Sequence, residues 1–466
     1  MIENTVGGCV PVPRKSGSLP SANRADGDDR TRAPLWEHLG WFLMLGLLII
    51  GLPMAYQRAI EHGADLAGFC DAGRYVFEHG TRNPESNLAR YWPSADVPWI
   101  VFALLPISVT AVLWYGIGCA AWIGLLRTIR GRMLVGLDPA AKRHATLAAG
   151  LMAMPLVIDG MSMGSFHVLM VWLMILGLDR ACRGEEKVGG ILLGLGAWLK
   201  LLPLLGIGFL FYHRKWKGAL IAMATVFVLD VALCVVAFGP SGAWREHVLW
   251  WQLGAAGTMN RQLATVASGD EDRLSNESVA VILRRMLTSL GSQPAAKLAT
   301  KFSAEIPAEK QEQLHNREVR RRVQLANLTP QQLQAVFLAM MAILVLGVAI
   351  YCRPVKSQDW AERGPAKIAL LTLATIWFSP VVWSYHFVAA TPVLAILLLR
   401  GRYRWQWVVP VIVVWGGALG LLAIDAIRAA GVLLWMSLIL SAGLVVFPIE
   451  KDIEADLVPR KACHEC

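Results

Sequence analysis

Two ionisable residues stand out in the sequence because of the apolar residues around them. Asp65 comes just before a stretch, residues 66–77, in which apolar residues recur at helical spacing, as in a helix that lies along a membrane surface. Asp65 could cap that helix, because aspartate accepts hydrogen bonds from the first free N–H groups. It could also act as a general base beside the bilayer and take a proton from a hydroxyl group. Asp71 is typical of a solvated helix residue and could pair with Arg74.

Lys200 is the second of these residues, and it lies in the middle of an apolar block that spans residues 188–212. Pro203 follows it and removes a helix hydrogen bond at this point. Basic residues flank the block on both sides, and short basic loops remain cytoplasmic. We therefore expect two half-helices that form a hairpin, with Lys200 at the outer tip. A lysine held there either meets an anion such as a phosphate or extends to the interface.

Further polar residues between the apolar blocks could bind a substrate. Arg284 and Arg285 could hold a phosphate, because arginine binds phosphate oxygens bidentately, or they could simply be solvated. His386 follows a Pro-Val-Val-Trp turn and either binds substrate or forms a structural hydrogen bond. The remaining candidate substrate-binding residues are Asn276, His167, Tyr91 and Asp71.

The composition is typical of a membrane protein. Of 466 residues, 55% are hydrophobic and 17% are charged, whereas soluble domains carry about 25% charged residues. A helix needs roughly 20 apolar residues to cross a bilayer core, and the net charge of +10 is spread between blocks of this kind. This distribution indicates membrane spans rather than a nucleic-acid partner. The apolar blocks are residues 36–56, 97–126, 144–160, 165–181, 188–212, 217–238, 334–352, 366–384, 385–399, 406–424 and 430–448.

The basic loops predict the orientation of these spans. When the short basic loops are placed in the cytoplasm, both termini are cytoplasmic as well. We therefore expect an all-α polytopic protein with about 11–12 membrane segments, counting the broken hairpin. The segments on the non-cytoplasmic side are then residues 57–96, 239–333 and the turn at 380–386. The expected domains are a disordered cytoplasmic leader over 1–35, a membrane catalytic domain over 36–448 and a cytoplasmic tail over 449–466.

Five motifs, in order along the chain, resemble those of glycosyltransferase family 87, which are polyprenol-phosphate-mannose-dependent transferases with a GT-C membrane fold. No single motif is specific, but their shared order from about residue 60 to 400 is a strong signal. The motifs are Asp65-Leu-Ala-Gly-Phe69 with Ala72-Gly73-Arg74, Gly164-Ser165-Phe166-His167, a Gly-rich helix that ends in Lys200-Leu-Leu-Pro203, Asn276-Glu277-Ser278 with Arg284, and Ser379-Pro-Val-Val-Trp-Ser-Tyr-His386.

Three of these motifs depart from the family pattern. Ser165 and His167 replace Gln and Asn, Glu277 replaces Gln, and Tyr385 replaces the first His of a pair. The departures leave the expected fold unchanged and bear on the donor sugar and the acceptor.

The resemblance implies inverting transfer of a hexose, mannose in the family, from polyprenyl phosphate. The implied acceptor is a lipid or glycan on the non-cytoplasmic face of the plasma membrane. The resemblance gives the role of general base to Asp65, and Lys200 is the natural partner of the phosphate. The partners are then the bilayer, the lipid-linked sugar and a glycolipid or glycan, with no nucleic acid.

We expect neither a metal nor a cofactor. The sequence contains no Gly-rich phosphate loop, no metal-ligand cluster and no Asp-x-Asp nucleotide-sugar motif, and their absence favours a lipid-linked donor.

Two alternatives remain beside the transferase. An inactive homologue could bind lipid-linked sugars without transferring them. A transporter or flippase would also use many helices and a broken hairpin, although the two halves of the chain show no internal repeat.

Overall fold

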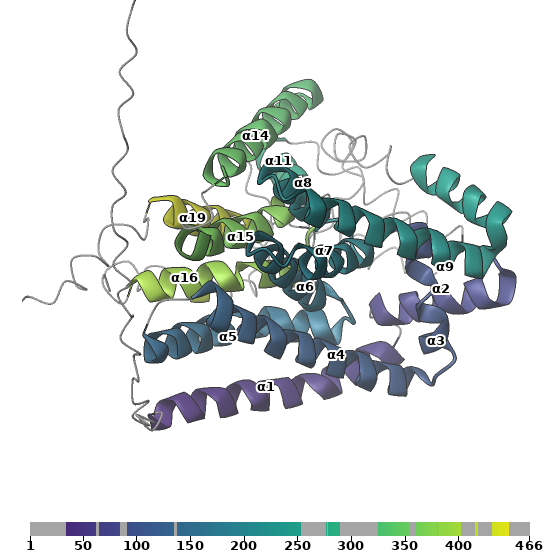
Figure 1. The fold of residues 1–466 in the computed structure, drawn as a ribbon, viewed down its shortest axis with the longest axis horizontal. Coiled ribbons are helices and arrows are strands. Elements are labelled where there is room, and N and C mark those ends of the chain that lie inside the picture. The colour runs from purple at the N-terminus through teal and green to yellow at the C-terminus, as the bar shows by residue number, and fades with distance from the viewer. Residues whose placement is uncertain are drawn as a thin grey trace, which may run out of the picture.

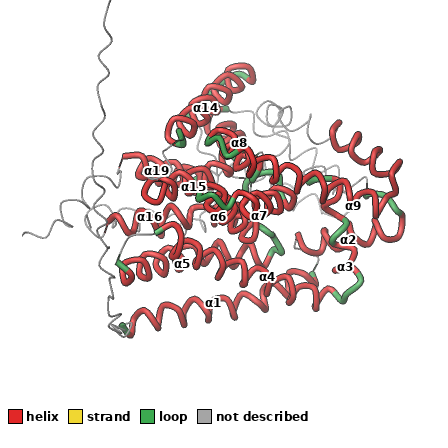
Figure 2. Tube along the Cα trace, in the orientation of Figure 1, coloured by secondary structure: helices red, strands yellow, loops and turns green. Residues whose placement is uncertain are grey.

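In the computed structural model, helices joined by loops and turns are the only regular secondary structure of the described residues (Figure 2). Among the described residues, five helices are long and apolar enough to cross a membrane: α1 (Leu35–Ile60), α4 (Ile107–Thr128, continued by the π-helical turn η3, Ile129–Met133), α5 (Pro139–Ser162), α9 (Trp216–Trp250) and α14 (Pro330–Tyr351). The protein is therefore an all-α polytopic membrane protein. The described residues are 34–61, 65–83, 91–134, 138–252, 276, 278–288, 325–354, 360–379, 381–401, 415–417 and 431–446.

Shorter helices complete the bundle and its caps. They are α2 (Asp65–His79), η2 (Pro93–Asp96), α3 (Trp99–Ala103), α6 (His167–Cys182), α7 (Glu186–Leu199), α8 (Leu204–Tyr212), α11 (Val279–Leu287), α15 (Trp360–Trp377), η6 (Ser384–Ala390), α16 (Thr391–Gly401) and α19 (Val432–Val446). Figure 1 shows α1, α4 and α5 side by side, with α6 and α7 at the centre.

Ion pairs and hydrogen bonds define one end of the bundle, which we name the basic end. Arg143 near the start of α5 pairs with Glu37 at the start of α1 at 3.0 Å. Arg132 in η3 pairs with Asp179 near the end of α6 at 2.6 Å. The start of α7 meets the start of α9 there, because Glu186 accepts a hydrogen bond from the Gly218 N–H.

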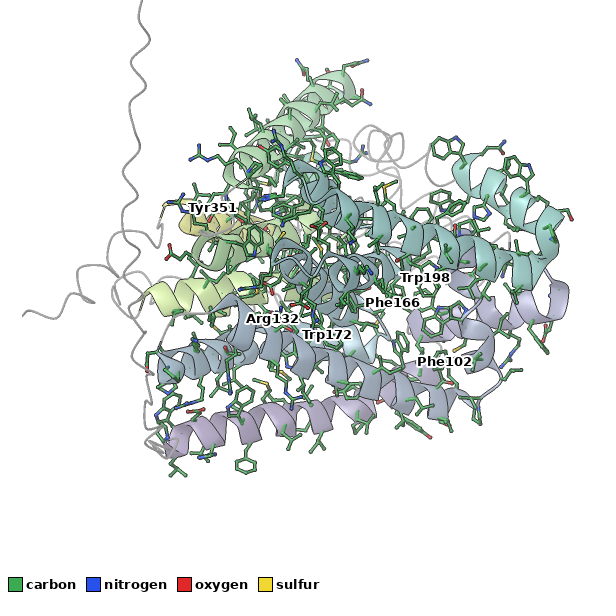
Figure 3. All side chains as sticks on the ribbon, viewed as in Figure 1. Phe102, Arg132, Phe166, Trp172, Trp198 and Tyr351 are labelled. Carbon is green, nitrogen blue, oxygen red and sulfur yellow. The ribbon has the colours of Figure 1, made fainter. Side chains whose placement is uncertain are left out.

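The opposite end, which we name the α2 end, holds α2, α3 and the last turns of α9 (Figure 1). Arg58 of α1 pairs there with Asp159 of α5 at 3.1 Å. Figure 3 separates the two ends along the long axis, with Tyr351 toward the left and Trp198 and Phe102 toward the right.

The block at 188–212 forms the broken hairpin that the sequence predicts. The helix α7 ends at Leu199, and Lys200 has an extended backbone with φ −156° and ψ 144°. The helix α8 then returns toward the basic end, where Leu210 and the carbonyl of Glu186 both lie within 3.5 Å of a Cβ placed on Gly218. The start of α7 and the end of α8 therefore share one end, and Lys200 lies at the other.

Glycines along α7 let its neighbours approach closely, as small residues do between membrane helices. Gly189 faces the backbone of Ala181 in α6, whereas Gly190 faces the backbone of Gly218 in α9. Gly194 packs against Thr225 of α9. The helix that carries Lys200 is thus fixed between two other helices.

Two predicted spans have different boundaries in the structure. The block at 97–126 is divided because the chain breaks its helix before Pro106, and α4 begins only at Ile107. The block at 217–238 continues to Trp250 through a kink at Gly239, whose φ is +68°. Pro240 disfavours the helical conformation in the residue before it, and glycine adopts the positive φ readily.

Several predicted segments lie outside the described residues. They are the leader up to residue 33, much of the outer segment at 239–333, most of the span at 406–424 and the tail at 449–466.

Candidate active site

Asp65 begins α2 at the α2 end of the bundle, and a hydroxyl group faces its carboxylate. The Tyr385 hydroxyl of η6 donates a hydrogen bond to Oδ2 of Asp65 at 3.0 Å. Burial raises the pKa of Asp65, while the Tyr385 hydrogen bond and the charge of Lys200 lower it and Asp159 raises it. The side chain is therefore a partly desolvated carboxylate, as a general base beside a membrane requires.

The turn between α5 and α6 fixes the position of Asp65. The Leu66 N–H donates to the carbonyl of Met163 at 3.2 Å. Gly164 adopts a φ of +75° and touches the backbone and Cβ of Leu66 so closely that a Cβ on Gly164 would overlap it. The Trp114 indole donates to the Gly164 carbonyl at 2.8 Å. A glycine is needed in this turn to bring α2 onto the bundle.

Lys200 meets two histidines that come from different parts of the chain. Its Nζ lies 3.0 Å from Nε2 of His167 and 3.3 Å from Nε2 of His386. The two imidazole rings are in contact, with centroids 3.7 Å apart, and both side chains are buried. The Tyr91 ring centroid lies 6.0 Å from the Lys200 ammonium.

The backbone determines which nitrogen of His386 carries the proton. The Trp383 N–H donates to Nδ1 of His386 at 3.0 Å. Because a backbone N–H can only donate, the neutral imidazole carries its proton on Nε2, which faces Lys200. A charged lysine and this N–H are then two donors directed at the same space, and the oxygen of an anion can accept from both.

Asp159 is a member of the site that the sequence interpretation missed. It pairs with Arg58 at 3.1 Å and accepts a hydrogen bond from the Ser384 hydroxyl at 2.9 Å. Arg58 also donates to the Ser162 hydroxyl at 2.6 Å. About a third of each charged side chain is exposed, 34% for Arg58 and 36% for Asp159. The signal was available, because a carboxylate inside the apolar block at 144–160 is expensive in a membrane.

Asn276 occupies a structural position beside the site. Its Oδ1 accepts hydrogen bonds from the backbone N–H groups of Ser278 and Val382, both at 3.0 Å. It therefore ties the start of α11 to the segment that leads into His386. Arg285 donates to the Asn276 carbonyl at 3.2 Å, and both Arg284 and Arg285 are buried rather than solvated.

The structure thus brings together five of the predicted site residues at the α2 end: Asp65, Lys200, His167, His386 and Tyr91. Asp71 is placed elsewhere, on the exposed surface of α2. The neighbouring Arg74 donates to the carbonyl of Ala103 at 3.4 Å.

Comparison with known proteins shows which families and proteins the chain is similar to. The profile of glycosyltransferase family 87 matches residues 90–300, a range that includes His167, Lys200 and Asn276. A polyprenol-phosphate-mannose-dependent alpha-(1-2)-phosphatidylinositol mannoside mannosyltransferase of Mycolicibacterium smegmatis is 25% identical over 324 residues. That match covers 67% of this chain and 61% of the relative, so the chain spans less than two thirds of the relative's length.

No solved structure matches the chain. The family profile, the mannosyltransferase relative and the all-helical membrane fold agree with one another. The chain is thus similar to glycosyltransferase family 87 over residues 90–300 and has the helices of a membrane protein.

Proposed function

We propose that this protein is a membrane glycosyltransferase that moves a hexose, mannose in the similar family, from polyprenyl phosphate to a hydroxyl group of a lipid or glycan on the non-cytoplasmic face. One observation carries the proposal. The partly desolvated carboxylate of Asp65 lies in one cluster with Lys200 and His386. Tyr385 donates a hydrogen bond to Asp65, and the next residue, His386, contacts Lys200. Sugar transfer from a lipid phosphate needs both a base and a partner for the leaving group.

Asp65 acts as the general base in the proposed reaction. The acceptor oxygen forms a bond to the anomeric carbon while its proton passes to the carboxylate of Asp65, and the bond from that carbon to the phosphate oxygen breaks. The electron pair of the broken bond leaves with the polyprenyl phosphate. Displacement of this kind inverts the anomeric centre, so a β-linked donor gives an α-linked product.

Lys200 and His386 stabilise the leaving phosphate. The Nε2–H of His386 is held toward Lys200 by the backbone hydrogen bond at Nδ1. A phosphate oxygen between them accepts a hydrogen bond from each group, which relieves the repulsion between the two donors. Charge-assisted hydrogen bonds of this type are about twice as strong as neutral ones.

Asp159 and Ser384 belong to the acceptor side of the proposed site. Ser384 is adjacent in sequence to Tyr385, whose hydroxyl holds Asp65, and its own hydroxyl donates to Asp159. The Asp159 carboxylate is about a third exposed and can accept hydrogen bonds from sugar hydroxyls, while its partner Arg58 can donate to them. We place the acceptor there, beside Asp159 and Ser384.

The distribution of charge supports a non-cytoplasmic active site. Basic residues gather at the end of the bundle opposite Asp65, and short basic segments remain in the cytoplasm. They include Arg130, Arg132, Arg143, Arg180, Arg183 and Lys217.

The experiment compares purified wild-type protein with Asp65→Asn in nanodiscs, supplied with radiolabelled polyprenyl-phosphate mannose and glycolipid extract. Asp71→Asn is the matched control, because it changes an exposed carboxylate on the same helix. We expect transfer by the wild type and the control, and a loss of about 100-fold or more in Asp65→Asn. Donor binding without transfer by the wild type would favour the inactive homologue. Absence of transfer from any polyprenyl-phosphate sugar would contradict the proposal.

A further inference from the structure

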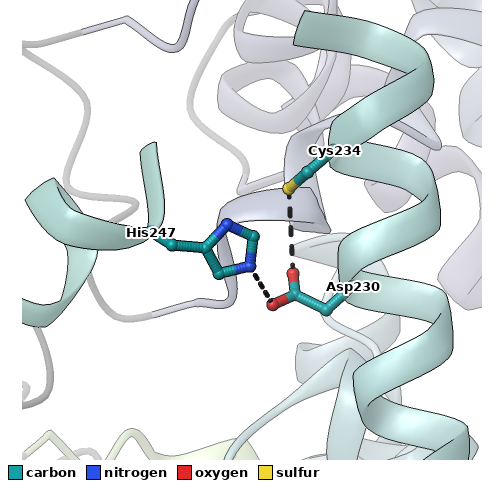
Figure 4. A group of neighbouring side chains, drawn as sticks. All are labelled: Asp230, Cys234 and His247. Atoms are coloured by element: carbon teal, nitrogen blue, oxygen red, sulfur yellow. Dashed lines mark hydrogen bonds and ion pairs between the residues drawn. The ribbon is translucent and has the colours of Figure 1, made fainter. Parts of the chain in front are cut away.

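Three side chains with metal-binding atoms converge near the kink in α9, away from the candidate active site. Asp230 and Cys234 lie one turn apart on α9, and His247 returns to them after the kink (Figure 4). One ligand atom from each residue lies within 4.8 Å of the other two. Asp230 and Cys234 are buried, and His247 is partly buried.

The hydrogen bonds of His247 direct the lone pair of its Nε2 atom at the carboxylate of Asp230, so that a proton or a cation is needed between them. Its Nδ1 lies 2.7 Å from the carbonyl of Ala243, which can only accept, so the proton of the neutral ring is on Nδ1. The Nε2 lone pair then faces Oδ2 of Asp230 at 2.9 Å. Two acceptors at this distance repel each other unless a proton or a metal ion lies between them. A hydrogen bond from Nδ1–H to a backbone carbonyl is also the usual support of a metal-binding histidine.

A proton would satisfy only two of the three groups. The fully buried Sγ of Cys234 lies 4.0 Å from Oδ1 of the same carboxylate, which is the outer limit of a sulfur hydrogen bond. That oxygen already accepts from the Ser94 N–H at 3.0 Å. A metal ion, by contrast, would engage the thiolate, the imidazole and the carboxylate together.

The surroundings of the three residues are acidic. Asp96 and Glu246 act electrostatically on Cys234 together with Asp230, and Arg82 opposes them. Asp96 and Glu246 are buried, and Oδ1 of Asp96 accepts no hydrogen bond from the part of the chain that the structure describes. Asp96 pairs with Arg82 and Glu246 pairs with Arg245, so a water molecule would supply the fourth ligand.

We propose that Asp230, Cys234 and His247 bind one divalent ion of the zinc class. Zinc prefers tetrahedral sets of nitrogen, sulfur and carboxylate ligands at roughly 2.0–2.3 Å, which places ligand atoms roughly 3–4 Å apart. Nε2 of His247 lies 2.9 Å from Oδ2 of Asp230, and Sγ of Cys234 lies 4.0 Å from Oδ1 of the same carboxylate, so small shifts of the side chains bring one atom of each residue to these separations. Binding deprotonates Cys234 and releases the thiol proton to solvent.

The ion has a structural role, because it fastens the segment of α9 after Gly239 to the segment before it. Asp230 also holds Ser94 of η2, whose hydroxyl accepts from the Trp198 indole at 2.8 Å. The Trp92 indole donates to the carbonyl of Ala197. The three proposed metal ligands are therefore connected through η2 to the end of α7, where Lys200 follows. The proposed structural role does not depend on which sugar is transferred.

The test measures metal in full-length protein purified in detergent from medium that contains zinc. We expect about one zinc ion per chain in the wild type and a loss of most of it in Cys234→Ser and His247→Gln. Matched controls are Cys119→Ser and His79→Gln, which change a half-buried cysteine and an exposed histidine outside this group. The controls should keep the wild-type metal content.

Cobalt replacement of the wild-type metal gives a second measurement that does not depend on the folding of a variant. Cobalt bound to a thiolate gives an intense sulfur-to-metal charge-transfer band, and the wild type should show it. A chelator should abolish the band and lower the melting temperature. A wild-type zinc content equal to that of Cys234→Ser and His247→Gln, or a cobalt spectrum without the thiolate band, would overturn the proposal. The three residues would then form an imidazolium–carboxylate pair beside an inert thiol.

Discussion

At the scale of single residues, Asp65 is largely buried, although its proposed role as a general base requires the ionised carboxylate. Burial raises its pKa, and the hydrogen bond from Tyr385 and the charge of Lys200 partly offset the effect. A base in this environment accepts a proton more readily than a solvated aspartate does. The same environment makes the ionised folded state less stable than it would be with a neutral residue.

Replacement of Asp65 by Asn should therefore stabilise the protein while it abolishes transfer. A group whose pKa is raised on folding contributes stability below its unfolded pKa and loses it as the pH rises through the folded pKa. The melting temperatures of wild type and Asp65→Asn should be similar in acid, and the variant should melt higher as the pH rises. A variant that melts lower than the wild type at neutral pH would contradict this account.

The pH dependence of transfer should also respond to Tyr385. Its hydroxyl lowers the pKa of Asp65, so Tyr385→Phe should raise that pKa further. The acid limb of kcat/KM, along which activity rises as Asp65 ionises, should move to higher pH. Tyr75→Phe, on the same helix as Asp65, serves as the control. An unchanged acid limb in Tyr385→Phe would show that this hydroxyl does not act on the titrating group.

Asn276 is predicted to act through structure rather than through substrate contact. Asn276→Ala leaves the N–H groups of Ser278 and Val382 without their acceptor, which costs about 1–3 kcal/mol of unfolding free energy for a buried pair. Denaturation in detergent measures the loss, with exposed Gln57→Ala as the control. Activity should fall together with stability. Full stability with a selective loss of substrate affinity would instead indicate a binding role.

The sequence singles out the main residues of the candidate site, because the energetic cost of a charged side chain in an apolar segment can be recognised without a structure. Lys200 in an apolar block is expensive unless an anion meets it, and Asp65 precedes an amphipathic segment. The sequence could not predict that Asn276 binds Val382, because that contact joins segments 106 residues apart. The hydrogen bond from the Trp383 N–H to His386 is local, but it depends on the exact geometry of the turn. Asp159 carried the same membrane signal as Lys200 and was overlooked.

At the scale of elements, glycines determine where α7 lies. A Cβ on Gly190 would overlap the carbonyl of Gly218 and touch Ile221, whereas a Cβ on Gly208 in α8 meets nothing within 4 Å. Substitutions at Gly190 therefore report on close packing between helices, whereas substitutions at Gly208 report on helix propensity alone. The sequence predicted both helices and the break between them from Pro203 and the flanking charges, but the faces that need glycine depend on which helices are neighbours.

Alanine substitutions at these two glycines should have opposite effects. Gly190→Ala should destabilise the protein by about 1–3 kcal/mol, because the extra methyl group forces α7 away from α9. Gly208→Ala should be neutral or stabilising by up to about 1 kcal/mol, because alanine favours helix over glycine. Thermal melting in detergent measures both. Equal effects would show that α7 and α9 are not packed as closely as described.

At the scale of the whole molecule, the arrangement of charges predicts the sidedness. The basic end should lie in the cytoplasm and Asp65 on the opposite side. A cysteine introduced at Asp71 should react with a membrane-impermeant thiol reagent added to intact cells, whereas one at Arg130 should react only after lysis. Both positions are exposed. The reverse pattern would place the site in the cytoplasm and exclude the proposed donor orientation.

The hairpin of α7 and α8 has a consequence for how the chain is threaded through the bilayer. The hairpin enters and leaves at the basic end, so it adds no net crossing of the membrane. The helices after it therefore have the same orientation in the membrane with or without it. Loss of either half alone would invert every later span and move His386 to the opposite compartment from Asp65. Loss of the whole hairpin would leave the later spans correctly inserted and remove only Lys200 from the site. An insertion error within residues 186–212 should therefore either invert the whole C-terminal half of the protein or leave its orientation unchanged.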